Sequence, residues 1–163
     1  MLDHPRILFV CKGNSVRSIL AEGLMRQAAG DRFDVRSAGA APNGRCSELA
    51  HETLAGFGAS TEGLHSKSWN DFAGNSDAPA DIVITLCDHV AEMPPPDWKP
   101  GALMAHWSVT DPGDLPLPPE QKPEAYRLTA TTIKRRIDAL LALPIASMQA
   151  DELQVALREI GWR

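Results

Sequence analysis

A predicted strand, a tight loop and a predicted helix follow one another near the start of this chain, and this junction restricts the possible folds most. Residues 6–10 form an apolar, β-rich run that predicts a buried strand ending at Cys11. Gly13 and Asn14 favour a tight loop. Residues 18–29 then show helical apolar spacing that places Leu20, Leu24 and Ala28 on one face, and Ser18 is the expected N-cap. Such a junction is typical of the ligand-binding edge of an open α/β sheet.

The rest of the chain continues this alternation. Further strands are expected at residues 33–37, 81–87 and 102–107, and further helices at residues 47–57, 67–72, 124–143 and 150–160. The proline-rich stretches 93–100 and 111–119 are expected to be irregular. This order predicts an α/β fold: a single-domain, three-layer open parallel sheet of about four strands with helices on both faces. We expect residues 1–144 to form the domain and residues 145–163 to form a C-terminal helical extension.

Charge, hydropathy and cysteine content exclude several classes of protein. A net charge of -5 gives no indication of a large nucleic-acid surface. No segment approaches the ~18 apolar residues of a spanning helix, and the N-terminus lacks the pattern of a secretory signal. We therefore expect a cytoplasmic protein with neither a nucleic-acid nor a membrane partner. Cys11, Cys46 and Cys87 are too few for a disulfide scaffold, and the five histidines show no metal-ligand spacing, so we expect no metal and no bound cofactor.

The chemistry is expected in the loop of residues 11–18, Cys-Lys-Gly-Asn-Ser-Val-Arg-Ser. Its backbone N–H groups can form an anion nest, and the helix that follows adds its positive end. The Arg17 guanidinium offers a planar fork for two oxyanion oxygens, so Cys11 would lie in a positive field that favours the nucleophilic thiolate. Ser18 can donate a hydrogen bond to that thiolate, and Asn14 can brace the loop. The predicted oxyanion-binding residues are Lys12, Gly13, Asn14, Ser15, Val16, Arg17 and Ser18.

This loop resembles that of the low-molecular-weight protein tyrosine phosphatase superfamily, which includes arsenate reductases built on the same fold. The resemblance covers about residues 5–143. Its residues, in order, are Leu8-Phe9-Val10-Cys11, Gly13-Asn14-Ser15, Arg17-Ser18, Ala21-Glu22, Ser37-Ala38-Gly39 and Asp111-Pro112. The family implies that Cys11 attacks phosphorus or arsenic and that Arg17 and the backbone of residues 12–17 hold the equatorial oxygens. It also implies that Asp111 protonates the leaving oxygen.

Two enzyme activities share this loop, and a second cysteine distinguishes them. A phosphatase hydrolyses the phosphocysteine with water, whereas in a reductase another thiol attacks the Cys11 adduct and leaves a disulfide and arsenite. Thr85-Leu86-Cys87-Asp88 resembles the segment of the first resolving cysteine in thioredoxin-coupled arsenate reductases. A buried strand-end thiol is the alternative for Cys87. His65-Ser66-Lys67-Ser68-Trp69, and the lack of an aromatic pair after Asp111-Pro112, also resemble the reductases.

One departure concerns the thiol relay. The further cysteine of the thioredoxin-coupled members is missing from Glu92-Met93-Pro94-Pro95-Pro96, and Val16 stands where the family often has cysteine. An external thiol is therefore expected to complete the cycle, either glutathione with glutaredoxin or thioredoxin, with a thiol-redox protein as a possible partner. Residues 88–98 are expected to be mobile so that they can deliver Cys87, and Cys46 is expected to be a partly buried thiol without a role.

The sequence thus predicts an arsenate reductase-like enzyme whose substrate is a small oxyanion. The alternatives that it leaves open are a low-molecular-weight protein tyrosine phosphatase, which hydrolyses phosphate monoesters through phospho-Cys11, and a non-catalytic oxyanion-binding or sensing module. The intact set of Cys11, Arg17 and Asp111 argues against the module, because binding alone needs no acid.

Overall fold

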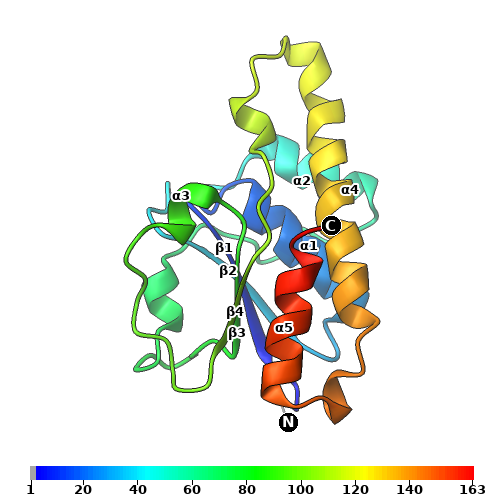
Figure 1. The fold of residues 1–163 in the computed structure, drawn as a ribbon. Coiled ribbons are helices and arrows are strands. Elements are labelled where there is room, and N and C mark those ends of the chain that lie inside the picture. Colours follow the sequence, from blue (N-terminus) through cyan, green and yellow to red (C-terminus); the bar gives the residue numbers. More distant parts are fainter. Residues whose placement is uncertain (1–2) are drawn as a thin grey trace.

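Four parallel strands form the centre of the molecule (Figure 1). In the computed structural model, which describes residues 3–163, the strands lie in the order β2-β1-β3-β4. Their bounds are Arg6–Cys11 for β1, Asp34–Gly39 for β2, Ile82–Thr85 for β3 and Leu103–His106 for β4. The two central strands, β1 and β3, are buried along almost their whole length, as their continuous apolar sequences require. The predicted open parallel sheet of about four strands is confirmed.

Helices cover both faces of the sheet, but unequally (Figure 1). The longer ones pack on one face and are α1 (Arg17–Ala29), α2 (Glu48–Gly56), α4 (Lys122–Leu141) and α5 (Ala150–Ile160). The other face is covered by the four-residue elements η1 (Trp69–Phe72) and α3 (Asp88–Ala91) and by the proline-rich segment that follows α3. Three more short 3-10 turns are η2 (Pro112–Asp114), η3 (Pro119–Gln121) and η4 (Ile145–Ser147).

Alternate residues of β1 enter two separate hydrophobic clusters, because successive side chains of a strand point to opposite faces. Ile7 and Phe9 belong to the larger cluster beneath α1, α4 and α5. Leu8 and Val10 belong to the smaller cluster beneath η1 and α3. Because the second cluster is small and its covering elements are short, that side of the sheet is held by far fewer apolar contacts than the first.

Two local expectations for α1 are wrong. The helix begins at Arg17 and its N-cap is Val16, which makes no side-chain capping hydrogen bond. Ser18 lies inside the first turn instead, fully buried, because its hydroxyl is bonded to the Cys11 thiol and the Asn14 amide. Ala28 is exposed, and the buried face of α1 is completed by other apolar residues, Ile19 and Met25 among them.

The last helix, α5, packs against the edge strand β4 (Figure 1). Leu153, Leu157 and Ile160 are buried in the larger cluster. The fully buried Trp107, which follows β4, donates its indole N–H to the carbonyl of Leu157 at 2.9 Å. Among residues 3–163, no helix combines the length and the apolar character that crossing a bilayer requires.

Candidate active site

Cys11 ends β1 and lines a pocket of about 450 Å³ at the carboxyl edge of the sheet. The walls come from the loop after β1, from Ala41 and Asn43 after β2, and from the segment that begins at Asp111. Since ligands of open parallel sheets bind at this edge, the topology places the thiol where the sequence predicted it. No aromatic side chain is among the described residues that line this pocket.

The Cys11 thiol has one close polar partner in the described structure, the hydroxyl of Ser18, 2.9 Å from Sγ. Ser18 in turn accepts a hydrogen bond from Nδ2 of Asn14 at 2.7 Å. A serine hydroxyl has a single hydrogen, and because its oxygen is already an acceptor here, that hydrogen remains available to Cys11. Because a thiolate has no hydrogen to give, Ser18 is the donor once Cys11 is ionised, and this hydrogen bond stabilises the thiolate.

The loop after Cys11 is held in shape by close packing against the end of β2. Asn14 is fully buried and adopts a left-handed backbone with φ 49°, a conformation that asparagine tolerates better than most residues. A Cβ on Gly39 would lie 2.7 Å from the carbonyl oxygen of Lys12 and 3.0 Å from the backbone N of Asn14. Only glycine therefore allows the end of β2 to lie this close to the loop, which explains why the Ser37-Ala38-Gly39 segment ends in glycine.

Arg17 has nitrogens that face three different surroundings. Nη1 donates to the carbonyl of Val109 at 3.1 Å, and Nη2 lies 3.8 Å from Oδ2 of Asp111. Nε is buried and has no hydrogen-bond partner among the described residues. Because a buried N–H without a partner is costly, this nitrogen is suited to receive an oxyanion oxygen.

Asp111 is brought to the same pocket by the segment that follows the edge strand β4. It is the N-cap of η2, where its Oδ1 accepts the backbone N–H of Gly113 at 2.8 Å. Its other oxygen is the one that faces Arg17. The structure therefore gathers Cys11, Arg17 and Asp111 around one hollow, and their catalytic roles stay predictions.

Cys87 is not brought into this pocket. It follows β3, is 7% exposed and forms the N-cap of α3, the short helix in the stretch for which we expected mobility. Since Val10 pairs with Thr85, Cys11 and Cys87 lie at the ends of neighbouring strands. Cys46 is partly buried, and burial raises the pKa of its thiol.

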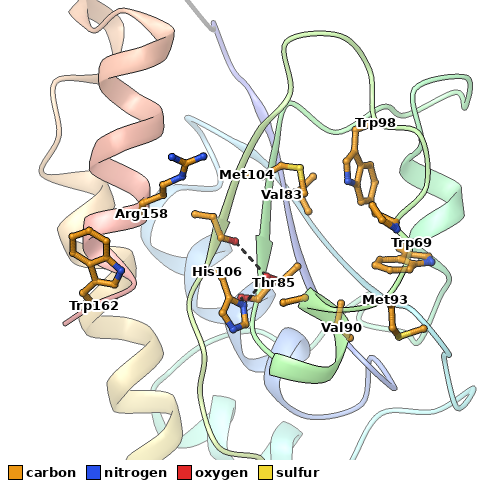
Figure 2. A pocket seen from close by; sticks show the side chains of 13 residues that line it. Trp69, Val83, Thr85, Val90, Met93, Trp98, Met104, His106, Arg158 and Trp162 are labelled. Atoms are coloured by element: carbon orange, nitrogen blue, oxygen red, sulfur yellow. Dashed lines mark hydrogen bonds between the residues drawn. The ribbon is translucent and has the colours of Figure 1, made fainter.

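A second hollow, of about 390 Å³, lies beside β3 and β4 (Figure 2). Trp69, Trp98 and Trp162 contribute to its walls, and so does His106 at the end of β4. The imidazole of His106 joins the Thr85 hydroxyl at 2.8 Å to Asp88 of α3 at 2.7 Å. None of the predicted site residues lines this hollow. In residues 3–163 no three His, Cys, Asp or Glu side chains are grouped to hold a metal ion.

Sequence reasoning gave Lys67 no part in a buried polar cluster behind the loop. Glu22 and Ser37 were noted among the matching residues and Lys67 within a motif, and in the structure these three side chains contact one another next to Asn14. The available signal was a glutamate on the inward face of α1, which is 1% exposed in the structure. A buried charge of this kind needs a partner.

The chain is similar in sequence and in structure to several known proteins. Residues 6–154 match the family model described as "Low molecular weight phosphotyrosine protein phosphatase". A protein of Halalkalibacterium halodurans named "Arsenate reductase" is 32% identical over 136 residues, which are 83% of this chain and 94% of that protein. The "Glutaredoxin arsenate reductase" of Synechocystis sp. is 29% identical over 137 residues, 84% of this chain and 96% of that protein. A solved structure described as "An arsenate reductase in oxidized state" is 27% identical, has a TM-score of 0.69 and covers 85% of this chain and 97% of its own.

Proposed function

Since the chain belongs to the low molecular weight phosphotyrosine protein phosphatase family, we propose that it is a thiol-dependent arsenate reductase that works through a Cys11 thiol-arsenate adduct. The observation that carries this proposal is the pocket in which Cys11, Arg17 and Asp111 meet. It holds a nucleophile, a cationic fork with an unpartnered N–H and an acid, the three groups that displacement on an oxyanion needs.

In the first step the Cys11 thiolate attacks arsenic(V). A sulfur–arsenic bond forms and an arsenic–oxygen bond breaks, and Asp111 supplies the proton with which the oxygen leaves as water. Arg17 binds the remaining oxygens through Nε and Nη2. The hydrogen bond from Ser18 stabilises the attacking thiolate before the new bond forms.

In the second step another thiolate attacks the sulfur of Cys11. A sulfur–sulfur bond forms, the sulfur–arsenic electron pair stays on arsenic, and arsenite with arsenic(III) departs. Cys87, at the end of the strand next to β1, is the internal candidate for this thiol. An external thiol then reduces the disulfide, and glutathione with glutaredoxin is favoured over thioredoxin because residues 92–96 carry no further cysteine.

Hydrolysis of phosphate monoesters is the second candidate, because the same three groups serve it. Two observations favour reduction over it: the pocket lacks an aromatic wall that would stack on a phosphotyrosine ring, and a second thiol lies on the neighbouring strand.

All three cysteines are free thiols, which suits a reducing compartment such as the cytoplasm.

One assay separates these functions. Arsenate turnover is measured with glutathione and glutaredoxin and, separately, with thioredoxin, beside hydrolysis of para-nitrophenyl phosphate. We expect arsenite to form with the glutathione system, and Cys11→Ser to abolish it. Hydrolysis of the aryl phosphate without arsenate turnover under either thiol system would establish the phosphatase instead. Binding of phosphate without any turnover would leave only the sensing module.

A further inference from the structure

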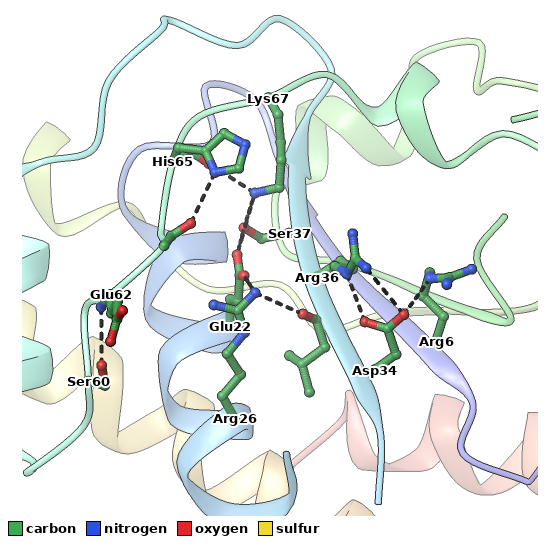
Figure 3. Close-up of polar contacts among 12 residues, drawn as sticks. Arg6, Glu22, Arg26, Asp34, Arg36, Ser37, Ser60, Glu62, His65 and Lys67 are labelled. Atoms are coloured by element: carbon green, nitrogen blue, oxygen red, sulfur yellow. Dashed lines mark hydrogen bonds and ion pairs between the residues drawn. The ribbon is translucent and has the colours of Figure 1, made fainter. Parts of the chain in front are cut away.

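A continuous line of buried polar groups leads away from Cys11 through Ser18 and Asn14, and its far end, at Ser37, Glu22 and Lys67, is drawn in Figure 3. Beyond Ser18 and Asn14, Nδ2 of Asn14 donates to the Ser37 hydroxyl at 3.0 Å. Ser37 lies 2.5 Å from Oε1 of Glu22. The line ends at Lys67, whose ammonium is 3.5 Å from the same Glu22 oxygen and 3.4 Å from the Ser37 hydroxyl.

The hydrogens along this line have one consistent direction. The backbone N–H of Lys67 can only donate, so the Asn14 oxygen that it meets at 2.9 Å is the acceptor and the amide NH₂ faces the two serines. Ser37 receives one of these hydrogens and gives its own to the carboxylate of Glu22. Ser18 receives the other and can give its own to the Cys11 thiolate.

The charges of Glu22 and its cationic partners determine whether this line of polar groups favours or opposes a thiolate at Cys11. Glu22 is almost completely buried, and its negative charge alone would oppose a thiolate at Cys11. Lys67 supplies the balancing positive charge from a side chain that is 12% exposed, whereas Arg26, which also pairs with Glu22, is 39% exposed and more strongly screened by solvent. Burial lowers the pKa of Lys67, and the adjacent Glu22 opposes that effect.

We propose that Lys67 is a positioning residue for the Cys11 nucleophile: its ammonium balances the negative charge of the buried Glu22 carboxylate, and its backbone N–H fixes Asn14, so that Ser18 is held as a donor to the thiolate. The proposal rests on the proposed function only in taking Cys11 as the nucleophile. Besides Lys67 and Arg26, the ionisable groups around Glu22 include Cys46, and those that face Cys11 in its pocket include Arg17 and Asp111. Lys67 does not line the Cys11 pocket, so the Lys67 end can be changed without altering a wall of the substrate pocket.

Access to the ion pair makes a direct test possible. A hollow of about 720 Å³ is lined by Glu22, Arg26 and Lys67 and opens beside the outer strand β2. If the side chain of Lys67 is shortened, a small amine can enter from this hollow and replace the missing ammonium. Such rescue would be specific to the charge at this place, because a bulky cation that donates no hydrogen bond cannot take the same position.

The experiment follows the pH dependence of Cys11 alkylation by iodoacetamide, read for the Cys11 peptide by mass spectrometry. Lys67→Met removes the charge but keeps the backbone N–H, and Lys67→Arg keeps both. Lys99→Met is the matched control, since Lys99 is also paired with a partly buried aspartate, Asp81, but has no hydrogen bond to this line. We expect the alkylation midpoint to rise by about 0.5 unit in Lys67→Met, an approximately threefold lower rate below the midpoint, and to stay unchanged in the other two variants.

Alkylation needs neither arsenate nor a reductant, so this result is independent of whether the proposed function is right. An unchanged midpoint in Lys67→Met, or an equal rise in Lys99→Met, would overturn the proposal. Lys67→Ala, refolded with ethylammonium, is the second variant and covers the case in which Lys67→Met does not fold. Ethylammonium should restore the parent midpoint. Equal restoration by tetramethylammonium at the same ionic strength would assign the effect to salt and also overturn the proposal.

Discussion

At the scale of single residues, the guanidinium of Arg17 links the two halves of the candidate site. It is tied through Nη1 to the backbone after β4 and faces Asp111 through Nη2, while Nε has no partner in the described structure. A lysine at this position has three N–H donors on a single nitrogen, and these cannot reproduce the planar spread of the guanidinium that meets all three surroundings. The geometry of the cation, beyond its charge, is therefore what the pocket uses.

Arg17→Lys should accordingly be severely damaging although it keeps the charge. We expect kcat/KM to fall on the order of 100-fold, about 2.7 kcal/mol of lost transition-state stabilisation, with arsenate or with an aryl phosphate. Arg127→Lys, in an exposed pair with Glu124 on α4, is the matched control and should be neutral. Near-normal kinetics of Arg17→Lys would exclude this residue as the oxyanion clamp.

The residues that were predictable from sequence are those that act within one local segment. The thiol, the arginine and the hydrogen bond from Ser18 to Cys11 all belong to a single strand–loop–helix junction, which is legible from residue types and spacing. The Glu22–Lys67 pair was not predictable, because it forms only when the segment after α2 packs against α1. The N-cap prediction for Ser18 failed for a similar reason. The sequence around Ser18 is typical of a helix N-cap, but in the folded protein its hydroxyl is hydrogen-bonded to the buried sulfur of Cys11.

At the scale of secondary-structure elements, α5 protects the exposed edge of the sheet. The side-chain amide of Gln154 pairs with both backbone groups of Met104: Oε1 accepts its N–H at 3.0 Å, and Nε2 donates to its carbonyl at 2.5 Å. The Gln154 amide thus makes the two hydrogen bonds that a neighbouring strand would make to Met104. These backbone groups are then not free to pair with a strand of another chain. The sequence predicted the helix from its apolar spacing, but this amide contact depends on where α5 docks.

Gln154→Ala should therefore weaken the docking of α5 and free the edge of β4. We expect a loss of about 1 kcal/mol in the free energy of unfolding in urea, because two hydrogen bonds at a partly exposed site disappear. Gln121→Ala, at a residue whose side chain makes no capping bond before α4, should change nothing. Turnover at the Cys11 pocket should be the same in both variants, and equal stability of the two would show that the amide pair contributes nothing.

At the scale of the whole molecule, the two faces of the sheet differ in how firmly they are covered. The long helices lie on one face, whereas the face near Cys87 is closed by α3, of which only Val90 is buried (Figure 1). An isolated helix of four residues has little stability of its own. Its first residue is held by the surface contact between Asp88 and His106, and the hydrogen bond from His106 holds the pKa of Asp88 below its usual range. Local opening of α3 is therefore expected to cost far less than opening of the central strands.

This difference leads to the last prediction, which concerns how Cys87 reaches the Cys11 adduct. A disulfide needs Cα atoms roughly 4.4–6.8 Å apart and aligned side chains, and the ends of neighbouring strands meet the first condition more readily than the second. Cys87 caps α3 and does not line the pocket, so α3 has to unwind for its sulfur to turn. After one arsenate turnover without added thiol, we expect a Cys11–Cys87 disulfide by mass spectrometry and rapid hydrogen exchange at the amides of residues 88–92.

Two variants separate the motion from the chemistry. Asp88→Asn weakens the contact with His106 and should speed exchange in α3 before any turnover, whereas Cys87→Ser should leave that exchange unchanged and strongly reduce arsenate turnover. Cys46→Ser is the control for loss of a thiol and should turn over arsenate normally. If turnover survives Cys87→Ser with glutathione present, the external thiol attacks Cys11 directly. In that case Cys87 is a core residue, and the face of the sheet that α3 covers has no part in the reaction.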